Sequence, residues 1–130
     1  AFGEALKVNT SLNSLSLDSN PLTSDGTDYS GVEQLAESLS DNKTLVYMNM
    51  WRTGVGSKGG MALSKVLAKN DSILFFDVGH NGIDLCDMKD IANKLDDNLA
   101  NYEIKERQRR TDEAGADVLK QKKEDIEDVS

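Results

Sequence analysis

Residues 73–83 read ILFFDVGHNGI, with apolar residues at the first, fourth, sixth and eleventh positions and Asn at the ninth. The same pattern is present in residues 45–55, LVYMNMWRTGV, where Thr replaces the Asn, and in residues 12–22, LNSLSLDSNPL. Alternate side chains of an extended chain point to opposite faces. The pattern therefore predicts three short strands that bury equivalent positions in a common core. These positions are Leu12, Leu45 and Ile73, then Leu15, Met48 and Phe76, then Leu17, Met50 and Val78.

A helical pattern follows each strand segment, with two apolar residues four apart and an Asn three residues later. The sets are Leu35, Leu39 and Asn42; Leu63, Leu67 and Asn70; and Ile91, Leu95 and Asn98. Equivalent helix positions are 28 residues apart, and the second and third strands keep this spacing. The first two strands are 33 residues apart, so the first unit carries five extra residues between Leu22 and Leu35. We expect this insertion to form a surface loop, because it is rich in Gly, Ser and Asp.

The pattern L-x-x-L-x-L-x-x-N-x-L is the signature of leucine-rich repeats. Neither the strand nor the helix of one repeat covers its own apolar side, so stacked neighbours supply the core. We therefore predict an α/β fold, a leucine-rich-repeat solenoid in residues 1–101 with a parallel sheet on the concave face and helices on the convex face. Ala5, Leu6 and Asn9 match the end of a preceding helix, so we expect an N-terminal part of the solenoid to lie outside this sequence.

Asparagines at two positions of the repeat have predicted structural roles. The Asn after each strand is expected to turn its amide inward and to satisfy backbone groups of the next repeat, which Thr53 does only in part. Asn9, Asn42 and Asn70 each begin an N-x-S/T string, which is also the acceptor pattern for N-glycosylation. Their shared place just after a helix favours a structural role, because Asn tolerates the left-handed conformation that ends helices.

The sequence changes character after Asn98, where few apolar residues remain and charges of both signs are frequent. Residues 102–130 are predicted to form a charged helical extension with ion pairs four residues apart. The predicted pairs are Glu103–Arg107, Glu106–Arg110, Lys120–Glu124 and Lys123–Glu127. The extension is either a helix that binds a partner or a solvated tail that caps the last repeat near Tyr102 and Ile104. In the second case it is expected to fray near Gly115.

The charge and cysteine content argue against several classes of partner. A formal net charge of −8 disfavours nucleic acid, because binding to nucleic acid depends on Lys and Arg that neutralise phosphates. The sequence has no run of about 18 apolar residues, so we expect no membrane-spanning helix and no membrane partner. Cys86 is the single cysteine, which favours a reducing compartment such as the cytoplasm.

The candidate catalytic, nucleotide and metal motifs have simpler structural explanations. Residues 54–59, GVGSKG, spell a dinucleotide-binding G-x-G-x-x-G, but the repeat accounts for these glycines as turn residues between a strand and a helix. His80 and Cys86 lack the paired spacing of a metal site. His80, Asp77 and Cys86 have no predicted pocket in which to act as a nucleophilic set. We therefore predict that the protein is not an enzyme and has no catalytic residues, metal, cofactor or small-molecule substrate.

The open face of the predicted sheet carries a cluster of aromatic residues. Its candidate partner-binding residues are Tyr47, Asn49, Trp51, Phe75 and Asp77. Tyr47 and Phe75 are equivalent positions on adjacent strands, about 4.8 Å apart. Aromatic side chains are frequent interface hot spots, and the concave face of a solenoid is a usual binding surface. The alternative is that the C-terminal helix, or a segment outside this sequence, covers these rings.

The 28-residue period, the LxxLxLxxN strands and the L-x-x-x-L-x-x-N helix ends resemble the ribonuclease-inhibitor-like class of leucine-rich repeats, over residues 1 to about 100. Within that class, residues 5–20, ALKVNTSLNSLSLDSN, are similar to the helix-end and strand segments of tropomodulin-like actin-capping proteins. The repeats with a charged helix also resemble proteins of ciliary and flagellar axonemes. The period and the acidic C-terminal character resemble solenoidal GTPase-activating proteins more weakly.

These resemblances imply three functions, of which the sequence favours the first. It is a non-catalytic protein–protein interaction scaffold, a structural subunit of a cytoskeletal or ciliary/axonemal assembly, which binds other cytoskeletal or axonemal subunits through the concave sheet face and the C-terminal helix. The alternatives are a tropomodulin-like regulator of actin-filament ends and a GTPase-activating regulator. The expected location is the cytoplasm and its cytoskeleton, including the axoneme. No actin-contact residues are carried over, because the insertion and the long tail depart from the tropomodulin pattern.

Overall fold

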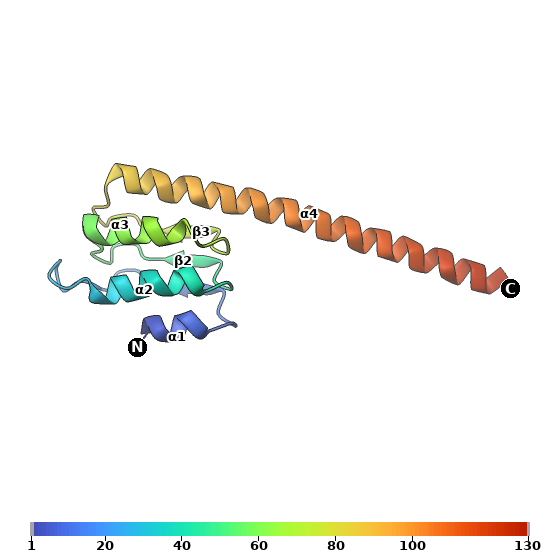
Figure 1. Cartoon of the computed structure of the whole chain (residues 1–130), viewed down its shortest axis with the longest axis horizontal. Coiled ribbons are helices and arrows are strands. Elements are labelled where there is room, and N and C mark those ends of the chain that lie inside the picture. Colours follow the sequence, from blue (N-terminus) through green and yellow to red (C-terminus); the bar gives the residue numbers. More distant parts are fainter. Residues whose placement is uncertain (1, 130) are drawn as a thin grey trace. The chain divides into compact units, whose positions relative to one another are not determined.

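The structure is a computed structural model that describes residues 2–129. Within this range it contains three strands and four helices (Figure 1). In chain order these elements are α1 (Phe2–Val8), β1 (Ser14–Ser16), α2 (Ser30–Asp41), β2 (Tyr47–Asn49), α3 (Gly56–Leu67), β3 (Phe75–Asp77) and α4 (Leu85–Val129). They form two compact units that divide between Asn98 and Leu99. We call residues 2–98 the repeat unit and residues 99–129 the helical unit; the predicted domains, 1–101 and 102–130, stay a prediction.

The three strands form one parallel sheet in the order β1-β2-β3. Equivalent positions of the sequence pattern pair in register, Leu15 with Met48 and Met48 with Phe76. Figure 1 shows the helices of the repeat unit stacked in chain order on one side of the strands. The predicted α/β class with a parallel sheet is confirmed. Three strands of three residues each are a small sheet, and a complete solenoid is not evident.

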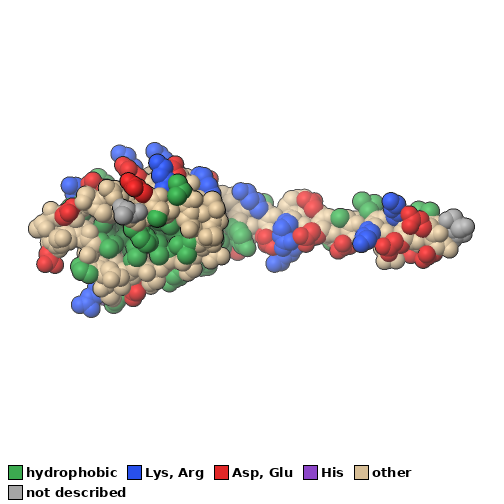
Figure 2. Space-filling model, turned by 90° about the horizontal axis from the view of Figure 1, so that it is seen from below, with side chains coloured by type: hydrophobic (Ala, Val, Ile, Leu, Met, Phe, Trp, Pro, Cys, Tyr) green, Lys and Arg blue, Asp and Glu red, His purple; other side chains and the backbone are tan. Residues whose placement is uncertain are grey.

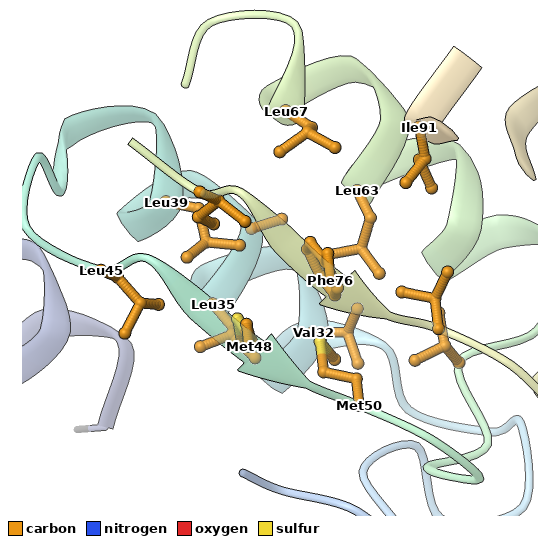
Figure 3. Close-up of a cluster of buried hydrophobic side chains, with 14 of the residues drawn as sticks. Val32, Leu35, Leu39, Leu45, Met48, Met50, Leu63, Leu67, Phe76 and Ile91 are labelled. Atoms are coloured by element: carbon orange, nitrogen blue, oxygen red, sulfur yellow. The ribbon is translucent and has the colours of Figure 1, made fainter. Parts of the chain in front are cut away.

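The core lies between the sheet and the helices, where the predicted inward positions meet (Figure 3). In the second and third repeats these strand residues are all buried: Leu45, Met48, Met50, Ile73, Phe76 and Val78. The helices contribute the buried residues Leu35, Leu39, Leu63, Leu67 and Ile91. Full burial of one such side chain stabilises the folded state by about 1.5–3 kcal/mol. The core is therefore assembled across repeats, since each repeat supplies only a few of these residues.

The first repeat is less well buried than the other two. Leu12 is exposed, and Leu15 and Leu17 are half-buried. Both β1 and β3 are edge strands, but the third repeat is followed by the first turns of α4, which supply Ile91 to the core and bond Asn98 to the Ile73 carbonyl. The described residues place no further strand on the outer side of β1. The prediction that Leu12 belongs to the core is therefore wrong. Figure 2, seen from the side of α1, shows apolar side chains gathered at this end of the repeat unit.

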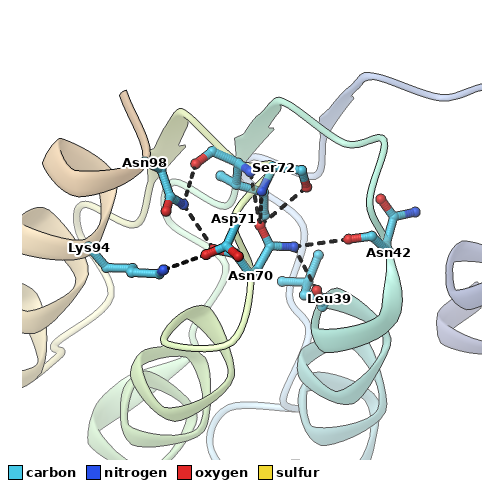
Figure 4. A network of polar contacts seen from close by, with 8 residues as sticks. Leu39, Asn42, Asn70, Asp71, Ser72, Lys94 and Asn98 are labelled. Atoms are coloured by element: carbon cyan, nitrogen blue, oxygen red, sulfur yellow. Dashed lines mark hydrogen bonds and ion pairs between the residues drawn. The ribbon is translucent and has the colours of Figure 1, made fainter. Parts of the chain in front are cut away.

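Asn70, at the end of α3, links two repeats (Figure 4). Its Nδ2 donates to the carbonyl oxygens of Leu39 and Asn42 in the preceding repeat, at 2.6 and 3.1 Å. Its Oδ1 accepts the N–H groups of Ser72 and Ile73, at 2.9 Å each. The side chain is fully buried. Asn70 thus satisfies the backbone groups of the turn between α3 and β3, which would otherwise be buried without partners.

Asn42 makes the equivalent bonds one repeat earlier, with Nδ2 donating to the Leu6 carbonyl at 2.8 Å and Oδ1 accepting the Leu45 N–H at 2.8 Å. Its backbone is extended, with φ −73° and ψ 126°, so the predicted left-handed conformation is wrong. The predicted structural role agrees with these bonds. The amide nitrogens of Asn42 and Asn70 are buried and bonded to carbonyls, which leaves them inaccessible for a glycan.

Asn81 links the turns that follow β2 and β3. Its Nδ2 donates to the Met50 carbonyl at 2.7 Å, and its Oδ1 accepts the N–H groups of Thr53 and Gly54 at 2.8 and 3.0 Å. These partners belong to the preceding repeat, so the predicted direction, toward the next repeat, is wrong. The Thr53 hydroxyl donates to the Met50 carbonyl at 2.9 Å, a bond within its own repeat.

The repeat pattern ends because the chain stays helical after Asn98. Extending the 28-residue period from the third strand would bring Asn101, Ile104 and Glu106 to the three inward positions. Two of these three side chains are polar, and burying a polar group without a partner costs about 2–7 kcal/mol. A fourth strand of this sequence is therefore disfavoured relative to a solvated helix.

Asn98 keeps the hydrogen bonds that Nδ2 makes in the earlier repeats but not those of Oδ1. Its Nδ2 donates to the carbonyl oxygens of Asn70 and Ile73, at 2.9 Å each. Its buried Oδ1 has no hydrogen-bond partner in the described part of the chain. In the earlier repeats this oxygen accepts N–H groups of the turn after the helix, but here the following residues remain within α4. The last repeat thus carries an unpaired buried acceptor that the others do not.

The helical unit remains helical through Gly115, so the predicted fraying near this residue is wrong. Among the described residues, the predicted pairs Glu103–Arg107 and Lys120–Glu124 are not formed. The side chains of this unit are almost all exposed. Its stability therefore depends on helix propensity and on contacts within the helix.

Arg109 is the centre of the ion pairs in the helical unit. It pairs with Glu106 three residues before it and with Glu113 four residues after it. Arg110 lies 3.8 Å from Glu106, which is the pair that the sequence predicted. The hydrogen bond from Arg109 is the main cause that lowers the pKa of Glu106. The hydrogen bonds from Arg109 to Glu106 and Glu113 raise the pKa of Arg109 further above its ordinary value.

Candidate protein-binding surface

The open face of the sheet carries the aromatic pair Tyr47 and Phe75. These residues lie in register on β2 and β3. Their side chains are 39 % and 54 % exposed, whereas the neighbouring Met48 and Phe76 are buried on the opposite face. Two partly exposed rings on adjacent strands form an apolar pair, whereas the other outward-facing strand residues, Ser14, Ser16, Asn49 and Asp77, are polar. We call Tyr47 and Phe75 the open-face pair.

Asn49 and Asp77 follow the open-face pair in the same register. Asn49 Oδ1 accepts the N–H of Trp51 at 2.9 Å, and Asp77 Oδ1 accepts the N–H of Gly79 at 3.0 Å. Each side chain thus stabilises the turn that ends its own strand. Their structural role is clear, and only the second polar atom of each side chain is left for a partner.

Trp51 is turned toward the third repeat. Its ring meets that of His80 edge to face, with centroids 5.0 Å apart and an interplanar angle of 67°. Gly79 makes room for the indole, since a Cβ on Gly79 would lie 3.2 Å from Trp51 Cδ1. Trp51 is half-buried and less available than the open-face pair. Sequence reasoning missed its contact with His80; the available signal was the large Trp51 beside Gly79 at the equivalent position of the next strand.

A hollow of about 390 Å³ lies among the three turns that follow the strands. We call it the turn hollow. It is lined by Ser19, Pro21, Thr23, Asp25, Gly26, Tyr29, Arg52, Thr53, Gly54, Gly56, His80 and Asn81. The insertion of the first repeat therefore forms one wall. The sequence identified the insertion as a loop, but not the hollow, because the hollow depends on how turns from three repeats stack in space.

The glycine-rich turn in the wall of the hollow offers no phosphate cradle. The N–H groups of Gly54 and Val55 are directed at Asn81 Oδ1, at 3.0 and 3.4 Å, and the N–H of Gly56 donates to the Asn81 carbonyl at 2.8 Å. Gly54 and Gly56 have φ values of 74° and 66°, which glycine adopts without strain. These glycines are thus turn residues whose N–H groups are already bonded.

Polar groups around the hollow fix its loops in place. Thr23, which is buried, donates from its hydroxyl to the Gly54 carbonyl at 2.6 Å and so joins the insertion to the second turn. The hydroxyl and the N–H of Ser30 both donate to Asp28, which lowers the pKa of that carboxyl. Lys58 Nζ lies 5.1 Å from the centroid of the ring of Tyr29, one of the lining residues, in a cation–π contact.

His80 and Cys86, which the sequence offered as metal ligands or nucleophiles, lie in different surroundings. His80 packs on Trp51, and Cys86 is exposed near the start of α4. In residues 2–129, no three His, Cys, Asp or Glu side chains are arranged to hold a metal ion. Over the same range, no helix combines the length and the apolar character needed to cross a membrane.

Comparison with known proteins identifies a structural relative. No family model matches the chain. A solved structure described as leiomodin-1 actin-binding site 2 matches 84 % of this chain with a TM-score of 0.68 and 27 % sequence identity. The chain spans 60 % of the length of that structure. The tropomodulin C-terminal domain of Caenorhabditis elegans matches 80 % of this chain and 95 % of its own, but at a TM-score of 0.37 and 8 % identity, from which we draw nothing.

The match to the leiomodin-1 structure supports part of the resemblance seen in the sequence. The likeness to tropomodulin-type repeat domains is supported by the leiomodin-1 structure. The finer assignment to the ribonuclease-inhibitor-like class and the axonemal resemblance receive no support from the proteins found. The chain is thus similar in fold, and at 27 % identity in sequence, to the actin-binding site 2 of leiomodin-1.

Proposed function

We propose that this chain is a non-catalytic protein-binding unit of the actin cytoskeleton, a tropomodulin-like module that binds actin. The observation that carries the proposal is the similarity to leiomodin-1 actin-binding site 2 over 84 % of the chain. The sequence favoured a scaffold of a cytoskeletal or ciliary assembly. The match favours the actin alternative instead, and it gives no support to a cilium. The GTPase-activating alternative stays a prediction without a specific observation in its favour.

The open-face pair is the surface we propose for this binding. Tyr47 and Phe75 are adjacent, partly exposed and held on the rigid backbone of the sheet. A rigid aromatic pair loses little conformational entropy when a partner covers it, and it removes apolar surface from water. Asn49 and Asp77 lie beside the pair and supply polar atoms at its margin. The helical unit, as a second surface toward partners, stays a prediction.

The non-catalytic part of the proposal is supported by two buried polar residues of the turn hollow. Asn81 and Thr53 are buried and bonded to the backbone of the turns. General acid–base or nucleophilic catalysis needs a side chain that is free to exchange a proton or attack a substrate. Asn81 and the hydroxyl of Thr53 hold the fold together and are not free for such a step, which agrees with the binding role that we propose.

Actin binding is tested by co-sedimentation with filamentous actin and by thermophoresis with fluorescently labelled monomeric actin. The double variant Tyr47→Ala/Phe75→Ala should bind at least tenfold more weakly. Truncating a hot-spot aromatic residue costs about 2 kcal/mol or more, and about 1.4 kcal/mol corresponds to a factor of ten. The matched control is Met61→Ala, which removes a side chain that is 59 % exposed on α3.

The two parts of this proposal fail in different ways. If the wild-type chain binds neither filamentous nor monomeric actin, the proposed function is wrong. If the wild type binds and the double variant binds equally well, the function stands and the open-face pair is not its site. A thermal melt of each variant shows whether a loss of binding reflects unfolding, since both rings are on the open face and contribute little to the core.

A further inference from the structure

One side of the helical unit carries almost no charge. Its residues recur at steps of three or four along α4, which places them on one face of the helix. The apolar members, Ile104, Val118, Leu119 and Ile126, are each more than half exposed. Figure 2 shows exposed apolar side chains among the charged ones in this unit. We call this side the uncharged stripe; it consists of Asn101, Ile104, Gln108, Thr111, Gly115, Val118, Leu119, Lys122 and Ile126, of which Lys122 alone is charged.

Two polar members of the stripe form hydrogen bonds within their own helix. The hydroxyl of Thr111 donates to the Arg107 carbonyl at 3.0 Å, and Gln108 Nε2 donates to Asp112 Oδ1 at 2.9 Å. These side chains therefore offer a neighbour mainly their methyl and methylene groups. Together with the four exposed apolar side chains, they leave apolar area in water that a second helix could bury.

The ion pairs of the helical unit lie on the other side of the helix. Their centre is Arg109, which pairs with Glu106 and Glu113. Arg109 is two residues from Thr111, or about 200° around the helix axis at 3.6 residues per turn. Arg107, at one edge of the stripe, forms no ion pair in the described part of the chain. The described ion pairs thus leave the stripe and this edge without a partner.

The charges along the helical unit form blocks that complement one another when their order is reversed. Residues 105–110 have a net charge of +3, residues 112–113 of −2, residues 120–123 of +3 and residues 124–128 of −4. A second copy that runs antiparallel, with the centre of symmetry near residue 117, places the first block against the fourth and the second against the third. A parallel copy would place blocks of like charge side by side. The charge order therefore favours an antiparallel, two-fold symmetric pair.

Both edges of the stripe give nearly the same centre of symmetry. Arg107 and Asp125 share one edge, because the 18 residues between them are about five turns of 3.6 residues. Asp112 and Lys123 share the other edge, since 11 residues are about three turns. In a two-fold interface, if one residue contacts a second, the second contacts the first. Arg107 of one copy then meets Asp125 of the other, and Asp112 meets Lys123.

We propose that the helical unit associates with a second copy of itself as an antiparallel helix pair, with the two uncharged stripes in contact and these ion pairs at the edges. The net charge of −8 repels two copies at long range. At about 0.15 M salt the Debye length is about 8 Å, so this repulsion is screened more strongly than ion pairs in contact. Exposed ion pairs and four apolar side chains contribute modestly, so we expect a Kd on the order of 0.1 mM and a monomer in dilute solution. The proposal is independent of actin binding.

Sedimentation equilibrium of the full chain tests the association, at loading concentrations from about 10 µM to about 1 mM, which span the expected Kd. The mean mass of the wild type should rise from that of a monomer toward that of a dimer. Val118→Gln/Leu119→Gln keeps a helix-forming residue at both positions and should stay monomeric. If the wild type is monomeric throughout, or if this variant associates as the wild type does, the proposal is wrong.

A charge exchange between Arg107 and Asp125 tests the antiparallel arrangement. Arg107→Glu and Asp125→Arg should each raise the Kd about tenfold, because each places like charges together at two symmetric points. The double variant Arg107→Glu/Asp125→Arg should return to within about twofold of the wild type, since opposite charges again meet between copies. The two residues are about 27 Å apart along one helix at 1.5 Å per residue, so this rescue cannot arise within one chain.

Lys65→Glu is the matched control for Arg107→Glu. Lys65 is exposed on α3, and the substitution makes the same change in net charge. It should leave the Kd unchanged, whereas an equal loss of association would mean that net charge, not pairing, determines the result. Circular dichroism of each variant in dilute solution shows whether its helix is intact. A double variant that keeps its helix but does not regain association would overturn the antiparallel pair.

Discussion

The repeat unit and the helical unit hold their backbones in opposite ways. In the repeat unit, buried hydrogen bonds join residues one period apart, such as Asn70 to Asn42 and Asn98 to Asn70. In the helical unit, ion pairs join residues three or four apart, and these side chains are largely exposed to solvent. The stability of the repeat unit is therefore collective, because each repeat completes its neighbour. That of the helical unit is local, and each contact adds little.

Asn70→Ala is expected to have the largest effect on the stability of the repeat unit. The substitution leaves the carbonyls of Leu39 and Asn42 and the N–H groups of Ser72 and Ile73 without their partners. Each buried unsatisfied group costs about 1–3 kcal/mol, and with partial relaxation we expect a loss of about 3 kcal/mol in the free energy of unfolding. Urea denaturation followed by Trp51 fluorescence measures this loss.

Asn9→Ala is the matched control for Asn70→Ala. Asn9 stands at the same position of the repeat and accepts the N–H groups of Ser11 and Leu12, but it is exposed. Water can replace those bonds, so the loss should be below about 1 kcal/mol. Amide exchange within residues 105–125 should be the same in both variants. Equal destabilisation by the two substitutions would show that burial does not determine how much each asparagine contributes to the free energy of unfolding.

The sequence predicts contacts that follow from periodicity. Met48 and Phe76 are one period apart, and equivalent positions of a parallel sheet fall in register, so their pairing and burial could be derived. The register of Tyr47 with Phe75 has the same origin. Leu12 fits the same pattern but is exposed. The pattern alone does not show which repeat has a neighbour to cover it, so this difference between Leu12 and Ile73 could not be derived.

Features that depend on stacking in three dimensions were not predictable in this way. The contact of Trp51 with His80 joins residues from adjacent turns, and its geometry depends on the conformation of each turn. The turn hollow requires the insertion to fold back onto Gly54, through a bond from Thr23 that no spacing rule indicates. The direction of the Asn81 bonds, toward the preceding repeat, is likewise a property of the stacked turns.

Gly115→Ala tests whether the stability of the helical unit is local. Gly115 is in the interior of α4, and a Cβ there would meet nothing within 4 Å. Replacing Gly by Ala in an exposed helix interior stabilises it by about 0.8–1 kcal/mol. We expect more helical circular dichroism and slower amide exchange near residue 115, with the unfolding midpoint of the repeat unit unchanged.

Gly60→Ala is the same substitution in the interior of α3, and it should have the opposite sign. A Cβ on Gly60 would lie 2.5 Å from Ile83 Cγ2, so the packing of α3 against the next turn must shift. The free energy of unfolding of the repeat unit should fall, although the helix propensity of α3 rises. If Gly60→Ala stabilises the chain as Gly115→Ala does, local propensity outweighs packing in the repeat unit, and the contrast between the two units is wrong.

The smallest effect is expected from Arg109→Ala, and it should depend on pH. The Arg109 hydrogen bond lowers the pKa of Glu106, so this pairing stabilises the helix while Glu106 is ionised, and the stabilisation is lost as the pH falls through the lowered pKa. Circular dichroism should therefore show less helix in Arg109→Ala than in the wild type at pH 7, and the difference should shrink in acid. Arg107→Ala removes an Arg that forms no ion pair among the described residues, and its difference from the wild type should not change with pH. Parallel pH profiles for the two variants would mean that the Arg109 pairs contribute nothing to the helix, and its stability would then rest on backbone propensity alone.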